Sequence, residues 1–290
     1  MTVGEPIPVS VEDAEWGRLV FDVRVEGPED GELVVLLHGF PQTSWSWHHQ
    51  IPVLAAAGYR VAAPDQRGYS AGARPEAVEA YRRDALVADV VNVASALGHD
   101  RFHLVGHDWG GAVAWQVAGR RGDRLLTVAS LATPHPQALA DAYAGALGGD
   151  QASRSGYVDL FRADGSEHGM LANDAAGLRL ILQGSGLSEH ESRPYLDALG
   201  TPEALGAALN WYRAASLADV DGLGEITVPT LYVWSTNDLA LGPEAAHATE
   251  DHVAGPYSFE VLHGVDHWIP EHAPDVTAEA LLANLALTRP

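Results

Sequence analysis

The sequence predicts an α/β fold, with a mostly parallel central sheet flanked by helices and an inserted helical segment. Short β-rich runs alternate with longer helical runs up to about residue 134, and the alternation resumes near residue 224. Strands that alternate with helices favour parallel pairing, with helices covering both faces of the sheet. Between these two parts helical patterns dominate and no convincing strand is found.

The individual elements follow from these patterns. Apolar and β-branched runs predict the strands, of which 32–38 and 59–65 are buried, and residues 77–98 form a long amphipathic helix. Strands are expected at 9–13, 19–27, 32–38, 59–65, 101–106, 124–133, 227–235 and 257–264, and helices at 77–98, 110–122 and 275–287.

The domain organisation follows from the same change of pattern. A chain of 290 residues can form one large domain or a domain with an insertion. We assign residues 1–134 and 224–290 to an α/β core and residues 135–223 to an inserted helical cap, or lid. Because the insertion lies between two core strands, it should project above one edge of the sheet.

Composition excludes several functions. The formal charge is −22, and all 17 basic residues are arginine, so lysine Schiff-base chemistry is impossible. This acidic balance argues against nucleic acid or anionic membranes as partners. Without cysteine there is no disulfide and no thiol nucleophile. The N-terminal sequence lacks a signal-peptide pattern, and no apolar run approaches the ~18–20 residues of a membrane span, so we expect a soluble cytoplasmic protein.

The phrase GHDWGG, from Gly106 to Gly111, follows an apolar run and precedes a predicted helix. A nucleophile on a sharp strand-to-helix turn needs small neighbours, and Gly106, Gly110 and Gly111 meet that need. The residue at the centre is Asp108, where many hydrolases have serine. Asp108 is therefore the candidate nucleophile, with N-capping of the helix as the alternative role.

Two later residues complete a candidate catalytic triad. Nucleophile-elbow enzymes follow the chain order nucleophile, acid, histidine. Asp238 comes just after a predicted strand, and His267 lies in a loop after the last strand. The 29-residue spacing (267 − 238) leaves room for one helix and one strand. Asp266 is a weaker alternative to Asp238, because the neighbouring position points it away from His267.

A fourth piece is HGFP at residues 38–41, directly after a buried strand. In this architecture an oxyanion hole uses the N–H after the nucleophile and one from this loop, which nominates the backbone N–H groups of Trp109 and Phe40. His263 and His267 are four residues apart, but the helical zinc motif requires Glu after the first His and Gly264 stands there. We therefore expect neither a metal nor a cofactor.

Together, HGFP, PDQRGYS (64–70), GHDWGG and HWIPE resemble the α/β-hydrolase superfamily, and most closely its branch with an aspartate nucleophile. That branch contains epoxide hydrolases and haloalkane dehalogenases. An aspartate is ionised near neutral pH and can attack saturated carbon, forming an ester with the substrate. The resemblance implies that His267, oriented by Asp238, then activates water to hydrolyse the ester on Asp108.

The leaving group separates the two activities. An epoxide opens to an alkoxide that gains from a proton donor, and tyrosine suits that task. LNWYRAA resembles the epoxide hydrolase segment that carries one such tyrosine, which implies Tyr212; SGYVDLFR resembles the other more loosely, which implies Tyr157. Tyr143 and Tyr195 remain alternatives to Tyr157.

These features predict an epoxide hydrolase that acts on a small-molecule epoxide and water, with Phe40 and Trp109 also contacting the substrate. Haloalkane dehalogenases usually carry Asn where Phe40 stands, whereas Trp109 suits either activity. A haloalkane dehalogenase is the alternative, and a catalytically silent binding protein with the same fold is a further one.

Overall fold

The computed structural model describes residues 3–288, which build a single sheet of eight strands. The strand order is β1-β2-β4-β3-β5-β6-β7-β8, and only the β1–β2 and β2–β4 pairs are antiparallel. The predicted fold class is confirmed. The strands are β1 (Ile7–Asp13), β2 (Gly17–Glu26), β3 (Leu33–Leu37), β4 (Arg60–Pro64), β5 (Phe102–His107), β6 (Leu125–Leu131), β7 (Thr230–Ser235) and β8 (Tyr257–Leu262).

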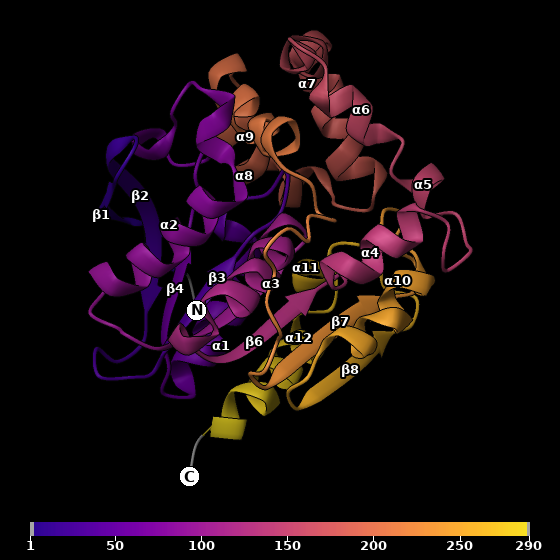
Figure 1. The fold of residues 1–290 in the computed structure, drawn as a ribbon. Coiled ribbons are helices and arrows are strands. Elements are labelled where there is room, and N and C mark those ends of the chain that lie inside the picture. Colours follow the sequence, from indigo (N-terminus) through magenta and orange to yellow (C-terminus); the bar gives the residue numbers. More distant parts are fainter. Residues whose placement is uncertain (1–2, 289–290) are drawn as a thin grey trace.

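Helices cover both faces of this sheet (Figure 1). Helices α2 and α3 pack against each other on one face, and α1 and α12 pack together on the other. Among residues 3–288 no helix is long and apolar enough to cross a membrane. The helices outside the β6–β7 connection are α1 (Gln50–Ala56), α2 (Arg83–Ala96), α3 (Trp109–Arg121), α10 (Pro243–Ala248), α11 (Ile269–His272) and α12 (Pro274–Leu285).

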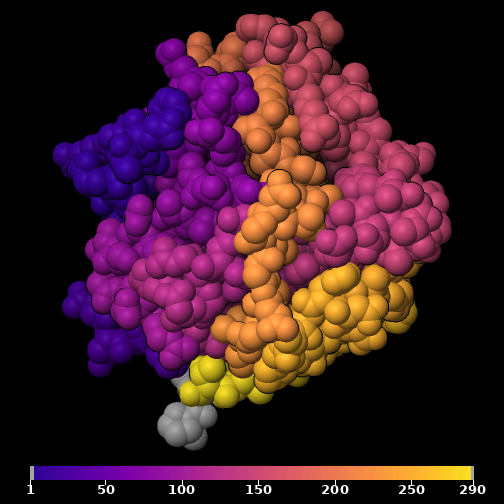
Figure 2. All heavy atoms as spheres, in the orientation of Figure 1, coloured from indigo at the N-terminus to yellow at the C-terminus, as the bar shows by residue number. Residues whose placement is uncertain are grey.

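The connection between β6 and β7 is long and helical. We call residues 135–223 the cap segment; it lies at the top of Figure 1, and the division of the chain at its boundaries stays a prediction. Figure 2 shows the last part of this segment, from α9 onward, as an orange band that continues down the surface towards β7. Its helices are α4 (Pro136–Tyr143), α5 (Gln151–Arg154), α6 (Tyr157–Arg162), α7 (Ser166–Gly184), α8 (Glu189–Leu199) and α9 (Pro202–Ala214).

The central strands are buried along their whole length because helices cover both faces of the sheet. Every residue of β3 and β5 is buried, as expected for strands in the middle of a parallel sheet. Because β3, β5, β6 and β7 run parallel, their carboxyl ends meet at one edge of the sheet. Loops that carry predicted site residues begin at this edge.

The helix expected at 77–98 was too long. Residues Val78–Tyr81 form a short 3₁₀ helix, Arg82 is extended with a ψ of 149°, and α2 begins only at Arg83. A tertiary contact accounts for this, because Arg67 Nη1 donates a hydrogen bond to the carbonyl of Ala80 at 2.9 Å.

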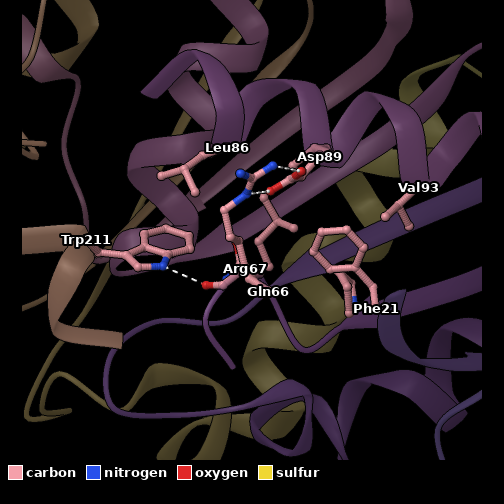
Figure 3. Close-up of a pocket in the computed structure, with 10 residues that line it drawn as sticks. Phe21, Gln66, Arg67, Leu86, Asp89, Val93 and Trp211 are labelled. Carbon is pink, nitrogen blue, oxygen red and sulfur yellow. Dashed lines mark hydrogen bonds and ion pairs between the residues drawn. The ribbon is translucent and has the colours of Figure 1, made fainter. Parts of the chain in front are cut away.

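Arg67 is completely buried and anchors several elements at once (Figure 3). Its guanidinium group donates two hydrogen bonds of 2.7 Å to Asp89 on α2 and one of 2.6 Å to Asp13 at the end of β1. Its backbone carbonyl accepts a 2.8 Å hydrogen bond from the indole N–H of Trp211 on α9. One residue therefore ties the sheet edge, α2 and the cap segment together.

This arrangement predicts a large stability effect at Asp89. The Asp89→Ala substitution leaves the buried guanidinium of Arg67 without its bidentate partner, which should lower the free energy of unfolding by about 3 kcal/mol. Denaturant unfolding followed by circular dichroism measures this. Asp197→Ala breaks the exposed Arg193–Asp197 pair and should change stability by less than about 0.5 kcal/mol. Equal effects of the two substitutions would contradict the interpretation.

Candidate active site

Asp108 lies on the turn between β5 and α3 in a conformation that few residues adopt. Its φ is 52° and its ψ is −120°. Three hydrogen bonds hold the turn: Asp108 N–H donates to the carbonyl of Leu131, and the Asp108 carbonyl accepts from Thr133 Oγ1 and from Ala112 N–H. The carboxylate is thereby fixed at the N-terminus of α3, where the helix dipole favours a negative charge.

The neighbouring glycines are required by the close packing around this turn. A Cβ atom on Gly106 would overlap the carbonyl of Gly110, and a Cβ atom on Gly110 would overlap the carbonyl of Leu37. A Cβ atom on Gly39 would come within 2.6 Å of Asp108 Oδ1. Only glycine allows the HGFP loop and the GHDWGG turn to approach this closely.

The HGFP loop supplies a hydrogen bond to Asp108 itself. The Phe40 N–H donates to Asp108 Oδ1 at 2.8 Å, as expected for one of the two oxyanion-hole donors. The Trp109 N–H, the other predicted donor, opens helix α3 but makes no hydrogen bond to the Asp108 carboxylate in the described part of the chain.

His267 lies between Asp108 and Asp238. Its Nδ1 is 2.8 Å from Asp238 Oδ2, and its Nε2 is 3.6 Å from Asp108 Oδ2. The second oxygen of Asp238 accepts hydrogen bonds from the N–H groups of Ala240 and Leu241. Asp266, the weaker alternative, instead contacts His272 at 2.8 Å.

The charges of this trio reinforce one another. Burial alone would raise the pKa of Asp108, but the bond and charge of His267 and the Phe40 N–H lower it overall. Burial would likewise disfavour a charged His267, but the charge of Asp238 and the bonds to both carboxylates raise the pKa of its imidazole well above 6.5. These interactions therefore favour the charged forms of Asp108 and His267 in the free site.

Two tyrosines of the cap segment face this charge cluster. Burial raises the pKa of Tyr212 and of Tyr157, and the charge of Asp108 raises both further. The ring of Tyr212 meets Phe40 and Trp109 edge-on, at centroid distances of 5.2 and 5.0 Å. The structure thus brings the two implied tyrosines to the side of the site opposite the sheet.

The two alternative tyrosines have other partners. Tyr195 donates a 2.6 Å hydrogen bond to Glu271. The hydroxyl of Tyr143 forms a hydrogen bond with Ser155. Burial raises the pKa of the Tyr143 phenol, and this bond opposes the rise.

A cavity of about 330 Å³ adjoins Trp109 and Tyr212 beneath the cap segment. This volume is at the lower end of the range for small-molecule pockets. Its wall combines aromatic, apolar and charged side chains, among them Tyr143, Val158, Asp159, Arg162 and Leu217. Among residues 3–288 no group of three or more His, Asp or Glu side chains is arranged to hold a metal ion.

Several residues that support the site were not identified from the sequence. The Nε2 of His107 lies 2.8 Å from the backbone carbonyl oxygen of His267. Arg154 donates to the Asp238 carbonyl, and Glu271 lies buried four residues after His267. The only sequence feature that pointed to Glu271 is its charge, because this Glu ends the HWIPE phrase after three apolar residues.

Comparison with known proteins agrees with this geometry. Residues 32–274 match the family model described as alpha/beta hydrolase fold. The chain is 36% identical to AB hydrolase superfamily protein YfhM of Bacillus subtilis, over 92% of this chain and 94% of that protein. It is 32% identical to Epoxide hydrolase A of Mycobacterium tuberculosis, over 91% and 94% of the two chains.

A solved structure described as one of several novel epoxide hydrolases from metagenomes of hot environments superposes with a TM-score of 0.84. It is 31% identical, and the match covers 99% of this chain and 100% of that one.

From the two carboxylates beside His267, Asp108 and Asp238, we predict how the pKa of its imidazole responds to mutation. In Asp108→Ala one of the two carboxylates is removed, so the imidazole pKa should fall towards its usual value. An NMR pH titration of the ring measures this shift. Asp266→Asn is the control, since Asp266 contacts His272, and should leave the His267 pKa unchanged. An unaltered pKa in Asp108→Ala would contradict the charge assignment.

Proposed function

The chain belongs to the alpha/beta hydrolase fold family and is a hydrolase most like epoxide hydrolases, and from that premise we propose that it converts a small-molecule epoxide and water into a vicinal diol. Asp108 acts as the nucleophile, His267 as the base and Asp238 as its orienting acid. No cofactor is needed for this reaction.

One observation carries the proposal. A carboxylate occupies the strand-to-helix turn, with the Phe40 N–H on one oxygen and His267 3.6 Å from the other. A carboxylate in this position is an ionised nucleophile that needs no base before it attacks carbon. The two phenols that face it supply the proton donors that an epoxide oxygen requires.

In the first step a carboxylate oxygen of Asp108 attacks one epoxide carbon. The carbon–oxygen bond of the ring breaks, and its electron pair moves onto the departing oxygen. Tyr212, assisted by Tyr157, gives that oxygen a proton, and an ester between Asp108 and the substrate remains. Their raised pKa values keep both phenols protonated until the alkoxide, a stronger base, develops between them.

In the second step water hydrolyses this ester. Esterification removes the charge of Asp108, so the pKa of His267 falls and its imidazole can act as a base. His267 takes a proton from water, and the hydroxide attacks the ester carbonyl. The Phe40 N–H then stabilises the developing oxyanion. The intermediate collapses with cleavage of the bond between the carbonyl carbon and the substrate oxygen. The departing alkoxide takes the remaining water proton from the new carboxyl group, so the diol leaves and Asp108 is again a carboxylate.

The proton balance closes over one turnover. The imidazolium of the free enzyme returns a proton to the tyrosinate left by ring opening. The neutral imidazole then recovers a proton from the attacking water. Epoxide and water are therefore consumed, the diol is formed, and every protein group ends in its starting state.

Haloalkane dehalogenation is the second candidate. The indole N–H of Trp109 is buried and interacts with the phenol of Tyr212, and such an N–H group could bind a halide. Phe40, however, offers no side-chain donor, and a halide leaves without a proton, so two tyrosines facing Asp108 would serve no purpose.

A trapping experiment separates the candidates. His267→Gln removes the base but keeps Asp108 intact, so an epoxide should remain attached as an ester. Intact-protein mass spectrometry after incubation with epoxide and haloalkane panels should show a mass gain equal to that of the epoxide. Peptide mapping should assign this mass to Asp108.

The Asp108→Ala variant is the control and should show no adduct. Halide release by the wild type without epoxide turnover would overturn the proposal in favour of a dehalogenase. No adduct and no turnover with either panel would support a binding protein without catalytic activity.

The role of Tyr212 predicts an effect on one step only. Tyr212→Phe should slow alkylation of Asp108 by about a hundredfold, the contribution of one general acid, and slow ester hydrolysis much less. Stopped-flow fluorescence and single-turnover assays measure the two rates. Tyr157→Phe should act in the same direction. Tyr143→Phe, whose hydroxyl bonds to Ser155, is the matched control; equal slowing of both steps by Tyr212→Phe would refute its role as acid.

A further inference from the structure

A chain of buried polar groups leads to the backbone of His267. It begins at Tyr195 on α8, whose hydroxyl donates to Glu271 Oε1 at 2.6 Å. The side-chain amide of Gln42 contacts the same oxygen through its Nε2 at 2.5 Å. Glu271 is only 8% exposed, and its other oxygen, Oε2, accepts no hydrogen bond within residues 3–288. A buried carboxyl group that makes no ion pair within residues 3–288 is costly, so its presence calls for an explanation.

The chain continues from Gln42 to the predicted base. Gln42 Oε1 lies 3.0 Å from His107 Nδ1, and His107 Nε2 lies 2.8 Å from the backbone carbonyl oxygen of His267. Both Gln42 and His107 are fully buried. Four consecutive contacts therefore connect a cap-segment tyrosine with the backbone of His267.

Counting donors and acceptors determines where the protons are. A neutral imidazole has a single N–H, and the carbonyl of His267 can only accept, so this N–H belongs to His107 Nε2. His107 Nδ1 then needs a donor, which the Gln42 amide provides when its nitrogen and oxygen exchange places. The amide oxygen now faces Glu271 and needs a donor in turn. A protonated carboxyl group is that donor, and 2.5 Å is typical of an O–H···O hydrogen bond.

The reverse assignment is a His107 cation linked through the amide to a Glu271 carboxylate. It places a second buried cation beside His267, whose ring centroid is 5.0 Å from that of His107. Burial and the charge of His267 lower the pKa of His107 to about 4, and burial raises the pKa of Glu271 to about 7. The charges of Asp108 and Asp238 raise the pKa of His107, but by less than burial and His267 lower it. Near Glu271 lie His272, which is paired with Asp266, and Glu191 on α8.

We propose that Glu271 is a neutral carboxylic acid that positions His267, through a hydrogen-bond chain from Tyr195 by way of Gln42 and His107 to the His267 carbonyl. The inference rests on the proposed function in one respect, namely that His267 is the base. The chain fixes the backbone of His267 without adding a charge. A carboxylate at Glu271 would stabilise the imidazolium further and make the neutral imidazole harder to form in the hydrolysis step.

Two substitutions of Glu271 test this assignment. Glu271→Gln keeps the shape, and its amide nitrogen can donate to Gln42 while its amide oxygen, on the neighbouring atom, offers Tyr195 an acceptor, so it should leave hydrolysis of the Asp108 ester within about twofold of the wild type. Glu271→Ala breaks the chain and should slow hydrolysis by about tenfold, the effect of one lost buried hydrogen bond, with a smaller change in alkylation. If Glu271 were a carboxylate paired with His107, the Gln variant would be as slow as the Ala variant, which would overturn the proposal.

Infrared difference spectroscopy reads the protonation state directly. The wild type minus Glu271→Gln spectrum at neutral pH should show the C=O stretch of a protonated carboxylic acid, shifted in D₂O. Carboxylate bands in its place would refute the assignment. Glu203→Gln, at an exposed glutamate on α9, is the control and should show only carboxylate bands and unchanged kinetics.

A second variant covers the case in which Glu271→Ala does not fold. Tyr195→Phe removes only the hydroxyl that holds Glu271, and should slow hydrolysis more than alkylation. Equal slowing of both steps would contradict a positioning role. The infrared measurement requires no substrate, so a carboxylic acid band in a protein that turns over no epoxide would overturn the proposed function and leave the proton assignment standing.

Discussion

The site depends on one backbone constraint, the positive φ of Asp108 at the end of β5. A residue other than glycine adopts this conformation only when its surroundings compensate for the strain. Here the compensation comes from hydrogen bonds to the end of β6 and from glycines that let the β3 loop reach the turn. The result is a carboxylate at the N-terminus of α3 that accepts the N–H of Phe40. Because the turn fixes this direction, the histidine and the second carboxylate of the trio reach Asp108 from the loops after β8 and β7.

The charge distribution around that carboxylate follows from its burial. Asp108 and Asp238 are only 5% and 2% exposed, so the two negative charges are tolerable only with a cation between them. His267 supplies this cation. In the proposed mechanism one of the two negative charges disappears when Asp108 becomes an ester, so the pKa of His267 falls. The same balance explains why the groups behind His267 should be neutral. A further charge on His107 or Glu271 would bias the imidazole towards one protonation state throughout the cycle.

The sequence predicted the residues whose roles depend on local geometry. Asp108, Asp238 and His267 each follow a recognisable strand, and Phe40 follows another, so topology alone brings them to one edge of the sheet. Glu271, Gln42 and Tyr195 could not be found in this way. Gln42 and Glu271 are 229 residues apart, and neither lies in a pattern that indicates the other. The start predicted for the 77–98 helix was too early for a similar reason. The carbonyl of Ala80 accepts a hydrogen bond from Arg67, which lies in a different loop.

Two aromatic residues of the cap segment connect the two halves of the proposed chemistry to the core. Trp211 bonds to the Arg67 carbonyl and precedes Tyr212 on α9, so the bond fixes the helix turn that carries the proposed ring-opening acid. Tyr195 bonds to Glu271 and so reaches the backbone of the base. The acid of the alkylation step and the base of the hydrolysis step are thus attached to the core through separate contacts, on α9 and α8. Substitutions in the cap segment can therefore alter one step while the geometry of the other is retained.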